Sequence, residues 1–217
     1  MSYRKEKKYR VTLSEFQQLK TILLSNGMEP LHNSRKVSSI YFDNKNNEMF
    51  SHSEEGVLLR KKVRIRWYDE RKEYTLEKKV SSIEGRFKTT TALEKISSID
   101  AALQYIPVDQ HYGVLSPTLK VSYERTYFSL LGMRITFDTN INYQDLRLNN
   151  RFTYKDPERV VEIKAPLDTN DDFIEKNSTL SNSSIFKILQ RVVNVSGPPL
   201  SILMGAVKQN YCGISLR

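Results

Sequence analysis

The most informative stretch of the chain reads Leu59-Arg60-Lys61-Lys62-Val63-Arg64-Ile65-Arg66-Trp67-Tyr68. Side chains alternate between the two faces of a β-strand, so every second residue shares a face. One face of this stretch carries Arg60, Lys62, Arg64 and Arg66, and the other carries Val63, Ile65 and Trp67. We predict a strand whose apolar face is buried and whose basic face, repeating about every 7 Å, suits a ligand with several anionic groups in line.

Length and composition limit the classes of protein to consider. The chain has 217 residues, 39% of them hydrophobic, and lacks a Pro/Gly/Ser-rich linker, so we expect one domain over residues 1–217. Gly197-Pro198-Pro199 should separate a short tail, at about 197–217, from the rest. The 34 basic and 25 acidic residues give a net charge of +9, which favours an anionic partner: phosphate, nucleotide, nucleic acid or a membrane surface.

The cysteine content and the amino-terminal sequence bear on the cellular compartment. Cys212 is the single cysteine, so an internal disulfide is excluded. Residues 1–5 are polar and charged where a signal peptide would be apolar. The apolar segment Leu200–Val207 is far shorter than the roughly 20 residues of a membrane-spanning helix. We expect a soluble chain in a reducing, cytoplasmic setting.

Outside the opening stretch, the sequence predicts many strands and few helices. Thr12-Leu13-Ser14-Glu15 has the pattern of a capping box, so a helix should begin there and end near Asn26-Gly27. Strands are predicted at 3–11, 37–43, 57–68, 73–80, 86–91, 119–128, 133–140 and 160–164, with a hairpin turn at 69–72. Two further helices are predicted at 98–105 and 183–193. This order favours an α+β fold with antiparallel strands.

The split between a polar and an apolar face recurs on four predicted strands, at residues 4–10, 75–80, 133–138 and 161–164. A solvated sheet face would also be polar, and for one strand alone that is the more common explanation. Here, however, Arg and Lys dominate, and long basic side chains on adjacent strands repel unless an anion lies between them. A closed or nearly closed sheet with these faces inward would form a basic tunnel.

Longer motifs on these strands resemble a known family. They are Arg4-x-Glu6-x-Lys8-Tyr9, Ser39-Ile40-Tyr41-Phe42-Asp43, Val63-Arg64-Ile65-Arg66-Trp67-Tyr68, Leu76-Glu77-Lys78-Lys79, Tyr123-Glu124-Arg125-Thr126, Arg134-Ile135-Thr136-Phe137-Asp138 and Val161-Glu162-Ile163-Lys164. In this order they cover most of the chain and resemble the vacuolar transporter chaperone (VTC) domain, a polyphosphate polymerase branch of the CYTH-like triphosphate tunnel metalloenzymes. The resemblance implies an antiparallel β-barrel with a central tunnel and flanking helices, and polyphosphate synthesis from ATP with Mn²⁺ or Mg²⁺.

Carried over residue by residue, the resemblance implies binding roles in this chain. The implied substrate-binding residues are Lys8, Arg64, Arg66, Lys79, Lys88, Arg125, Arg134 and Ser184, of which Lys8, Arg64, Arg66 and Lys79 are also assigned to catalysis. Glu162 is the implied metal ligand, with Glu6 as a second carboxylate. The superfamily's first strand begins Glu-x-Glu-x-Lys, whereas Arg4 stands here in place of the first glutamate. That change favours phosphate chains over the hydrolysis of simple triphosphate.

The last predicted helix departs from the family pattern. Family members tend to carry Ser-Lys-Tyr or Ser-Lys-Phe there, whereas this chain reads Ser184-Ile185-Phe186-Lys187. Ile185 therefore replaces a lysine. Lys187 would point about 200° away from Ile185 on a helix, at 100° per residue. The departure bears on activity more than on fold.

The predicted chemistry is consistent with these residue types. Phosphoryl transfer depends on positioning the phosphates and neutralising their charge. A guanidinium binds two phosphate oxygens at once, whereas lysine supplies a compact charge. We expect Arg64, Arg66, Arg125 and Arg134 to hold the triphosphate and the chain, Lys8, Lys79 and Lys88 to neutralise charge, and Glu162 to position the metal.

The expected function is transfer of the terminal phosphoryl group of ATP to polyphosphate. The alternatives are a triphosphatase that uses the same tunnel and a module that binds polyphosphate or another polyanion without turnover, which the replacement at Ile185 favours. The expected ligands are ATP, triphosphate and polyphosphate, and a membrane-protein partner would place the cytoplasmic chain at a membrane. Nucleic-acid binding ranks third. The aromatic residues that could stack on bases are better explained as core, since Trp67 lies on an apolar face; they are Tyr41, Phe42, Trp67, Tyr123, Tyr127 and Phe128.

Three histidines, the cysteine and Glu77 are of residue types that often occur in functional sites. His32, His52 and His111 are scattered near predicted loops without metal-ligand spacing, so surface positions are expected. Cys212 has no recognisable base motif and is not expected to be a nucleophile. For Glu77, an ion pair with neighbouring basic residues and a metal role are about equally supported.

Overall fold

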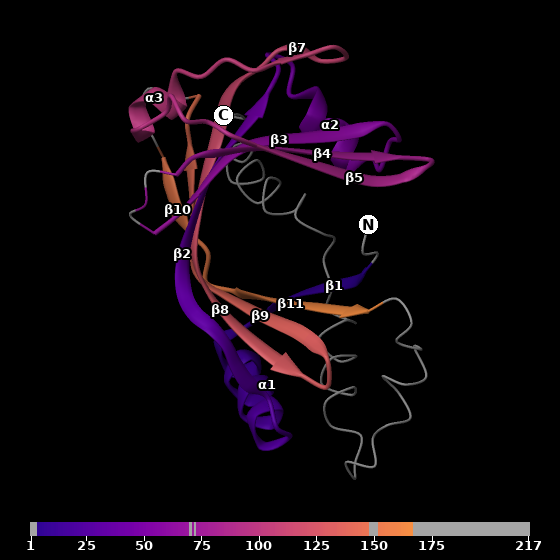
Figure 1. The fold of residues 1–217 in the computed structure, drawn as a ribbon, viewed down its shortest axis with the longest axis vertical. Coiled ribbons are helices and arrows are strands. Elements are labelled where there is room, and N and C mark those ends of the chain that lie inside the picture. The colour runs from indigo at the N-terminus through magenta and orange to yellow at the C-terminus, as the bar shows by residue number, and fades with distance from the viewer. Residues whose placement is uncertain (1–3, 70, 72, 148–151, 167–217) are drawn as a thin grey trace, which may run out of the picture. The chain divides into compact units, whose positions relative to one another are not determined.

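The computed structural model describes residues 4–69, 71, 73–147 and 152–166, most of which lie in β-strands (Figure 1). The strands are β1 (Arg4–Val11), β2 (Glu29–Asp43), β3 (Arg60–Tyr68), β4 (Thr75–Ser82), β5 (Gly85–Ala92), β6 (Val108–Asp109), β7 (Gly113–Val114), β8 (Ser116–Leu130), β9 (Met133–Asp145), β10 (Thr153–Lys155) and β11 (Arg159–Pro166). The helices are α1 (Leu13–Ser25), α2 (Glu48–Glu54) and α3 (Ile99–Leu103). The predicted α+β class is confirmed.

One nine-stranded sheet contains nearly all of these strands. Its order is β1-β11-β9-β8-β2-β3-β4-β5, with β10 paired to β9, and β6 and β7 form a separate two-stranded sheet. The strand pairs whose register is defined are antiparallel. Figure 1 shows β3, β4 and β5 running side by side, as the predicted hairpin across residues 69–72 requires.

The described residues divide into two compact units, each assembled from separate segments of the chain. The first unit lies within 4–35, 124–141 and 156–166, and the second within 36–123 and 142–155. β2, β8 and β9 each contribute residues to both units. Each unit has its own hydrophobic core.

Helix α1 covers the core of the first unit. Leu19 and Leu23, on its buried face, belong to a cluster with Phe128, Ile135 and Phe137. The predicted capping box is present: the hydroxyl of Thr12 accepts a hydrogen bond from the Glu15 amide at 3.3 Å, and the Glu15 carboxylate accepts one from the Thr12 amide at 2.8 Å. These bonds satisfy two backbone donors that a helix start otherwise leaves unpaired.

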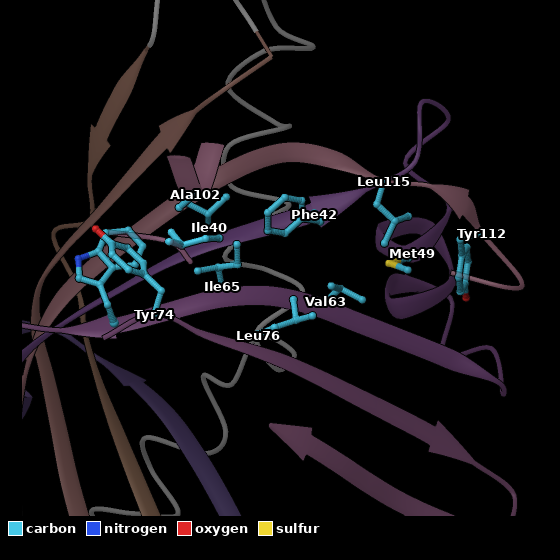
Figure 2. Close-up of a cluster of buried hydrophobic side chains, with 12 residues drawn as sticks. Ile40, Phe42, Met49, Val63, Ile65, Tyr74, Leu76, Ala102, Tyr112 and Leu115 are labelled. Carbon is cyan, nitrogen blue, oxygen red and sulfur yellow. The ribbon is translucent and has the colours of Figure 1, made fainter. Parts of the chain in front are cut away.

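The core of the second unit contains the apolar face of β3. Val63 and Ile65 are 1% and 0% exposed, and Trp67 packs in the same cluster. Figure 2 shows Val63 and Ile65 beside Leu76 of β4 and Ile40 of β2. The predicted burial of this face is confirmed, and the alternation of the strand then directs Arg64 and Arg66 to the opposite face.

Some elements differ from the prediction. Helix α2 was not predicted; its first turn is held by Asp43, whose carboxylate accepts hydrogen bonds from the amides of Met49 and Phe50 at 3.0 and 2.9 Å. β6, β7 and β10 were also missed, and the strand predicted from 57 begins at Arg60. The helix predicted at 183–193 and the tail with Cys212 lie outside the described residues. None of the helices within the described ranges is both long and apolar enough to cross a membrane.

Candidate functional site

The predicted site residues fall into two groups, one in each compact unit. The first unit holds Glu6, Lys8, Arg125, Arg134 and Glu162, and the second holds Arg64, Arg66, Lys79 and Lys88. Ser184, Ile185 and Lys187 lie outside the described residues.

In the second unit, the strand register arranges the polar face in cross-strand rows. Directly paired residues on adjacent strands share a face. One row is Tyr41–Arg64–Glu77, and the rows on either side of it are Ser39–Arg66–Thr75 and Lys62–Lys79–Lys88. Three lysines directly opposite one another repel, so the last row favours an anion. The register thus brings Lys79 and Lys88 together.

Glu77 is the counterion within this basic face. It is 4% exposed, and Arg64 approaches one of its carboxylate oxygens with Nε at 2.7 Å and Nη2 at 2.5 Å. Lys88 contacts the other oxygen at 2.5 Å. Burial alone would raise the pKa of Glu77, but Arg64, Lys88 and Arg66 together lower it to about 2. Glu77 thus forms the ion pair expected with its basic neighbours.

Hydroxyl groups hold the two guanidinium groups of β3. Arg64 donates through Nη1 to the Tyr41 hydroxyl at 2.9 Å. Arg66 donates through Nε to Ser39 Oγ at 3.2 Å and through Nη2 to the Tyr123 hydroxyl at 3.3 Å. Both arginines are only 9% exposed, so these partners offset the loss of water. Tyr41 and Tyr123 were expected in the core, but their hydroxyls contact these arginines. Because Tyr41 alternates with the core residues Ile40 and Phe42, its face could have been inferred.

The first unit has a comparable set of rows across β1, β11 and β9. These rows are Lys8–Glu162–Thr136 and Glu6–Lys164–Arg134. The Lys8 ammonium lies 3.2 Å from Glu6 and 3.5 Å from Glu162. The Lys164 ammonium lies 3.2 Å from Glu6 and 2.7 Å from Glu162. Lys164, which was not predicted as a site residue, therefore bridges the same two carboxylates as Lys8.

Arg125 adds a third cation beside Glu162. Its Nη2 lies 3.4 Å from Glu162, which is 3% exposed. Burial would raise the pKa of Glu162, but Lys8, Arg125 and Lys164 lower it to about 2. Glu162 is therefore a carboxylate at any physiological pH, as a metal ligand or a counterion must be.

Two buried polar atoms in this group have no hydrogen-bond partner within the described part of the chain. They are Nε of Arg134 and the hydroxyl oxygen of Thr136. A buried donor left unpaired is unfavourable, and such groups in native proteins call for an explanation. Thr136 is directly opposite Glu162 in the register, so both unpaired atoms come from the rows that also carry Lys8 and Lys164. An anion bound at this face would supply the missing acceptors.

The predicted metal ligands Glu6 and Glu162 lie among lysines, with few other groups in the described ranges that could bind a metal ion. Within the described residues, no group of three His, Cys, Asp or Glu side chains is placed to hold a metal ion. Mg²⁺ sites in phosphate-handling proteins use one or two carboxylates, with phosphate oxygens and water as the remaining ligands. Glu6 and Glu162 fit such a shared site. They do not fit a metal held by the protein alone, because Lys8 and Lys164 between them contact both oxygens of each carboxylate.

The three histidines pack against tyrosine rings. His52 is half-buried, and its Nδ1 lies 2.9 Å from the Tyr112 hydroxyl. His111 packs edge-on against the same tyrosine, and His32 packs against Tyr127. His32 and His111 are exposed, as predicted, whereas His52 is partly covered.

Comparison with known proteins identifies the family. The model of the VTC domain family matches residues 3–188. The chain belongs to the VTC domain family. No curated protein matches the sequence of this VTC domain.

Solved structures share the fold of this VTC domain at low sequence identity. A Bacillus halodurans protein described as a "putative adenylate cyclase" is 16% identical, with a TM-score of 0.51 over 89% of this chain and 91% of that chain. A conserved hypothetical protein from Pyrococcus furiosus is 15% identical, with a TM-score of 0.47 over 88% of this chain and 90% of that chain. The family match and the B. halodurans structure confirm the predicted class, the antiparallel triphosphate tunnel fold with flanking helices.

Proposed function

We propose that this VTC domain is a metal-dependent phosphotransferase that transfers the terminal phosphoryl group of ATP to a polyphosphate chain. The observation that carries the proposal is the basic face of β3, β4 and β5. Arg64 and Arg66 are buried there with their guanidinium groups held in place, and the lysine row lies next to them. Such an arrangement suits a linear polyanion, since adjacent cations meet successive phosphates.

The reaction requires little covalent chemistry from the protein. A terminal oxygen of the acceptor chain attacks the γ-phosphorus of ATP, the bond to the β–γ bridging oxygen breaks, and ADP leaves. We assign the arginine forks to phosphate oxygens and the lysines to charge neutralisation. The hydroxyl partners keep the forks fixed before the phosphates arrive, which lowers the cost of ordering them on binding.

The first unit would bind phosphate through Arg125, Arg134 and Lys8, and its two unpaired donors support this role. Glu162 and Glu6 would hold Mn²⁺ or Mg²⁺, which when bound neutralises charge on the phosphates. A cytoplasmic location, with a membrane-protein partner that receives the product, belongs to the same proposal.

One alternative has a specific observation in its favour. Ile185 stands where the family tends to carry lysine, and a missing cation at the transferring phosphate would weaken turnover more than binding. The chain would then be a polyphosphate-binding module. A triphosphatase that uses the same residues is the third outcome.

A product analysis separates these functions. The protein is incubated with ATP and Mn²⁺, and polyphosphate, free phosphate and cyclic AMP are measured separately; cyclic AMP is included because of the description of the B. halodurans relative. Polyphosphate indicates a polymerase, and free phosphate alone indicates a triphosphatase. If neither product forms but the protein still binds triphosphate, it is a binding module.

The variant Arg64→Ala ties the products to the basic face, and Arg71→Ala in the exposed β3–β4 turn is its control. The proposal predicts loss of polyphosphate in the first variant and normal synthesis in the second. Synthesis that survives Arg64→Ala would overturn the proposed role of β3.

A further inference from the structure

Tyr41 is in direct contact with the buried guanidinium group of the basic face. It is directly opposite Arg64, which is directly opposite Glu77, so the guanidinium group has an acceptor on each neighbouring strand. The Tyr41 hydroxyl accepts the hydrogen bond from Arg64 Nη1 at 2.9 Å, and Arg64 Cζ lies 5.7 Å from the centre of the tyrosine ring. The backbone carbonyl of Tyr41 accepts a further bond from the Thr118 hydroxyl at 3.2 Å, which fixes the strand there.

The proton of this hydroxyl has no acceptor among the described residues. A phenol offers one donor and two acceptor positions. Arg64 occupies an acceptor position, which leaves the O–H free to donate. Tyr41 is half-buried, and the cations that act most strongly on it are Arg64, Arg66 and Lys62. A donor among cations can only be satisfied by an anion or by water.

We propose that Tyr41 is a further phosphate-binding residue, whose hydroxyl donates a hydrogen bond to an oxygen of the phosphate that Arg64 and Arg66 bind. The inference rests on the proposed function in one respect, because it needs a phosphate at this face. An O–H donor to a charged oxygen makes a short, strong bond, and it adds a neutral donor to a face whose other phosphate contacts are cationic.

The same position makes phosphate binding sensitive to pH. Burial raises the pKa of the Tyr41 hydroxyl, but Arg64, Arg66, the hydrogen bond from Arg64, and Lys62 lower it to about 8. Three further groups act through Arg64. Glu77 on β4 offsets part of its charge, Lys88 on β5 contacts Glu77, and Tyr123 on β8 interacts with Arg64. Above pH 8, Tyr41 becomes a phenolate, which cannot donate and repels an anion.

Two consequences follow for binding. Below pH 8 the Tyr41 hydroxyl donates a hydrogen bond to the phosphate. Above pH 8 the phenolate must first take up a proton before the same hydrogen bond forms. The affinity that depends on Tyr41 should therefore fall by up to about tenfold per pH unit above 8. A phosphate bound at this face should also raise the pH at which Tyr41 ionises.

The test measures binding of inorganic tripolyphosphate by titration calorimetry from pH 7 to pH 9.5. It compares wild type with Tyr41→Phe and with Tyr154→Phe, a control on β10 whose ring stacks on Tyr143. At pH 7 we expect Tyr41→Phe to bind about tenfold more weakly than wild type, as for a lost bond to a charged group. The difference should disappear by about pH 9, and Tyr154→Phe should follow wild type throughout. Titrations of the lysines and of the ligand itself are common to all three proteins and cancel.

A second measurement needs no variant. In wild type, the tyrosinate absorbance that appears near pH 8 should shift by more than one pH unit when saturating tripolyphosphate is present. Equal affinity and equal pH dependence for wild type and Tyr41→Phe, or a tyrosine titration that the ligand leaves unchanged, would overturn the inference. If Arg64→Ala abolishes binding in that case, the proposed phosphate site stands without Tyr41. If wild type does not bind tripolyphosphate, both the proposed function and this inference are overturned.

Discussion

Arg125 and Asp138 form a bidentate pair in which both guanidinium–carboxylate distances are short. Nε and Nη2 of Arg125 each lie 2.6 Å from a different carboxylate oxygen of Asp138. The same Nη2 lies 3.4 Å from Glu162. Two parallel bonds fix the plane of a guanidinium group. Asp138, which is 6% exposed and was not predicted as a site residue, thus holds Arg125 beside the predicted metal ligand.

Replacing Asp138 by asparagine is expected to destabilise the protein. The substitution keeps the shape but removes the buried carboxylate charge that pairs with the part-buried Arg125, and breaking such a pair costs about 3 kcal/mol. Urea unfolding at pH 7 measures the loss. Tripolyphosphate should restore part of it, because a bound phosphate is a new anionic partner for Arg125.

The matched control for this variant is Asp145→Asn. Asp145 also binds an arginine through two oxygens, with Arg147 Nε at 3.1 Å and Nη2 at 2.7 Å. The Arg147 side chain is 42% exposed, so water replaces the lost partner and we expect a loss of only about 1 kcal/mol. Equal losses in the two variants, or no recovery of Asp138→Asn with tripolyphosphate, would contradict the role given to Asp138.

Glu77→Gln is expected to strengthen anion binding. The carboxylate of Glu77 competes with phosphate for Arg64 and Lys88, and glutamine keeps the size while removing that charge. We expect tripolyphosphate affinity to rise about fivefold, or ~1 kcal/mol. Titration calorimetry at pH 7 gives the value, and Glu84→Gln in the exposed β4–β5 turn is the control. Weaker binding by Glu77→Gln would mean that Glu77 serves mainly to position Arg64.

The sequence was sufficient to predict the two faces of β3 but not the neighbours of its arginines. Side chains alternate with a period of two in any strand, so the burial of Val63 and Ile65 follows from the residue order alone. The partners of Arg64 depend on strand register, and Tyr41 and Glu77 lie 23 and 13 residues away in the chain. No local pattern specifies that register.

Two other missed features have the same origin. Helix α2 begins where the Asp43 carboxylate accepts hydrogen bonds from backbone amides. The helix has only seven residues and no apolar period, so its sequence does not predict it. Strand alternation places Lys164 on a polar face, but its position between Glu6 and Glu162 depends on the pairing of β1 with β11. Long-range pairing, not residue type, determines both.

Metal binding is expected to require phosphate. Lys8 and Lys164 contact the oxygens of Glu6 and Glu162 that a cation would use, and two ammonium groups repel a dication. We expect Mn²⁺ alone to bind only weakly, and Mn²⁺ with tripolyphosphate to bind at least about tenfold more tightly, since phosphate oxygens attract the lysines and complete the ligand set. The unbound Mn²⁺ signal in electron paramagnetic resonance measures both affinities.

In the presence of tripolyphosphate, Glu162→Gln should bind Mn²⁺ no more tightly than free tripolyphosphate does. Mn²⁺ binding by tripolyphosphate without protein is measured as the background. The control is Glu15→Gln, at the start of α1, which keeps a carbonyl oxygen for the capping bond and should behave as wild type. Tight binding of Mn²⁺ without phosphate would contradict this prediction.

The free energy of unfolding is expected to fall steeply in acid. The pKa values of Glu77 and Glu162 are lowered from 4.5 to about 2, because cations surround both buried carboxylates. A depressed pKa stabilises the fold fully above pH 4.5, where the unfolded carboxyl is also ionised, and this contribution is lost as the pH falls towards 2. Each group contributes up to about 3 kcal/mol over that window. Urea unfolding at pH 7, 5, 4 and 3 should therefore show little change down to pH 5 and a marked loss below it.

The double variant Glu77→Gln/Glu162→Gln should be less stable at pH 7 but lose less between pH 5 and pH 3, whereas Glu84→Gln should follow wild type. A wild-type unfolding free energy that is the same at pH 5 and pH 3 would show that these carboxylates are not held by the cations around them.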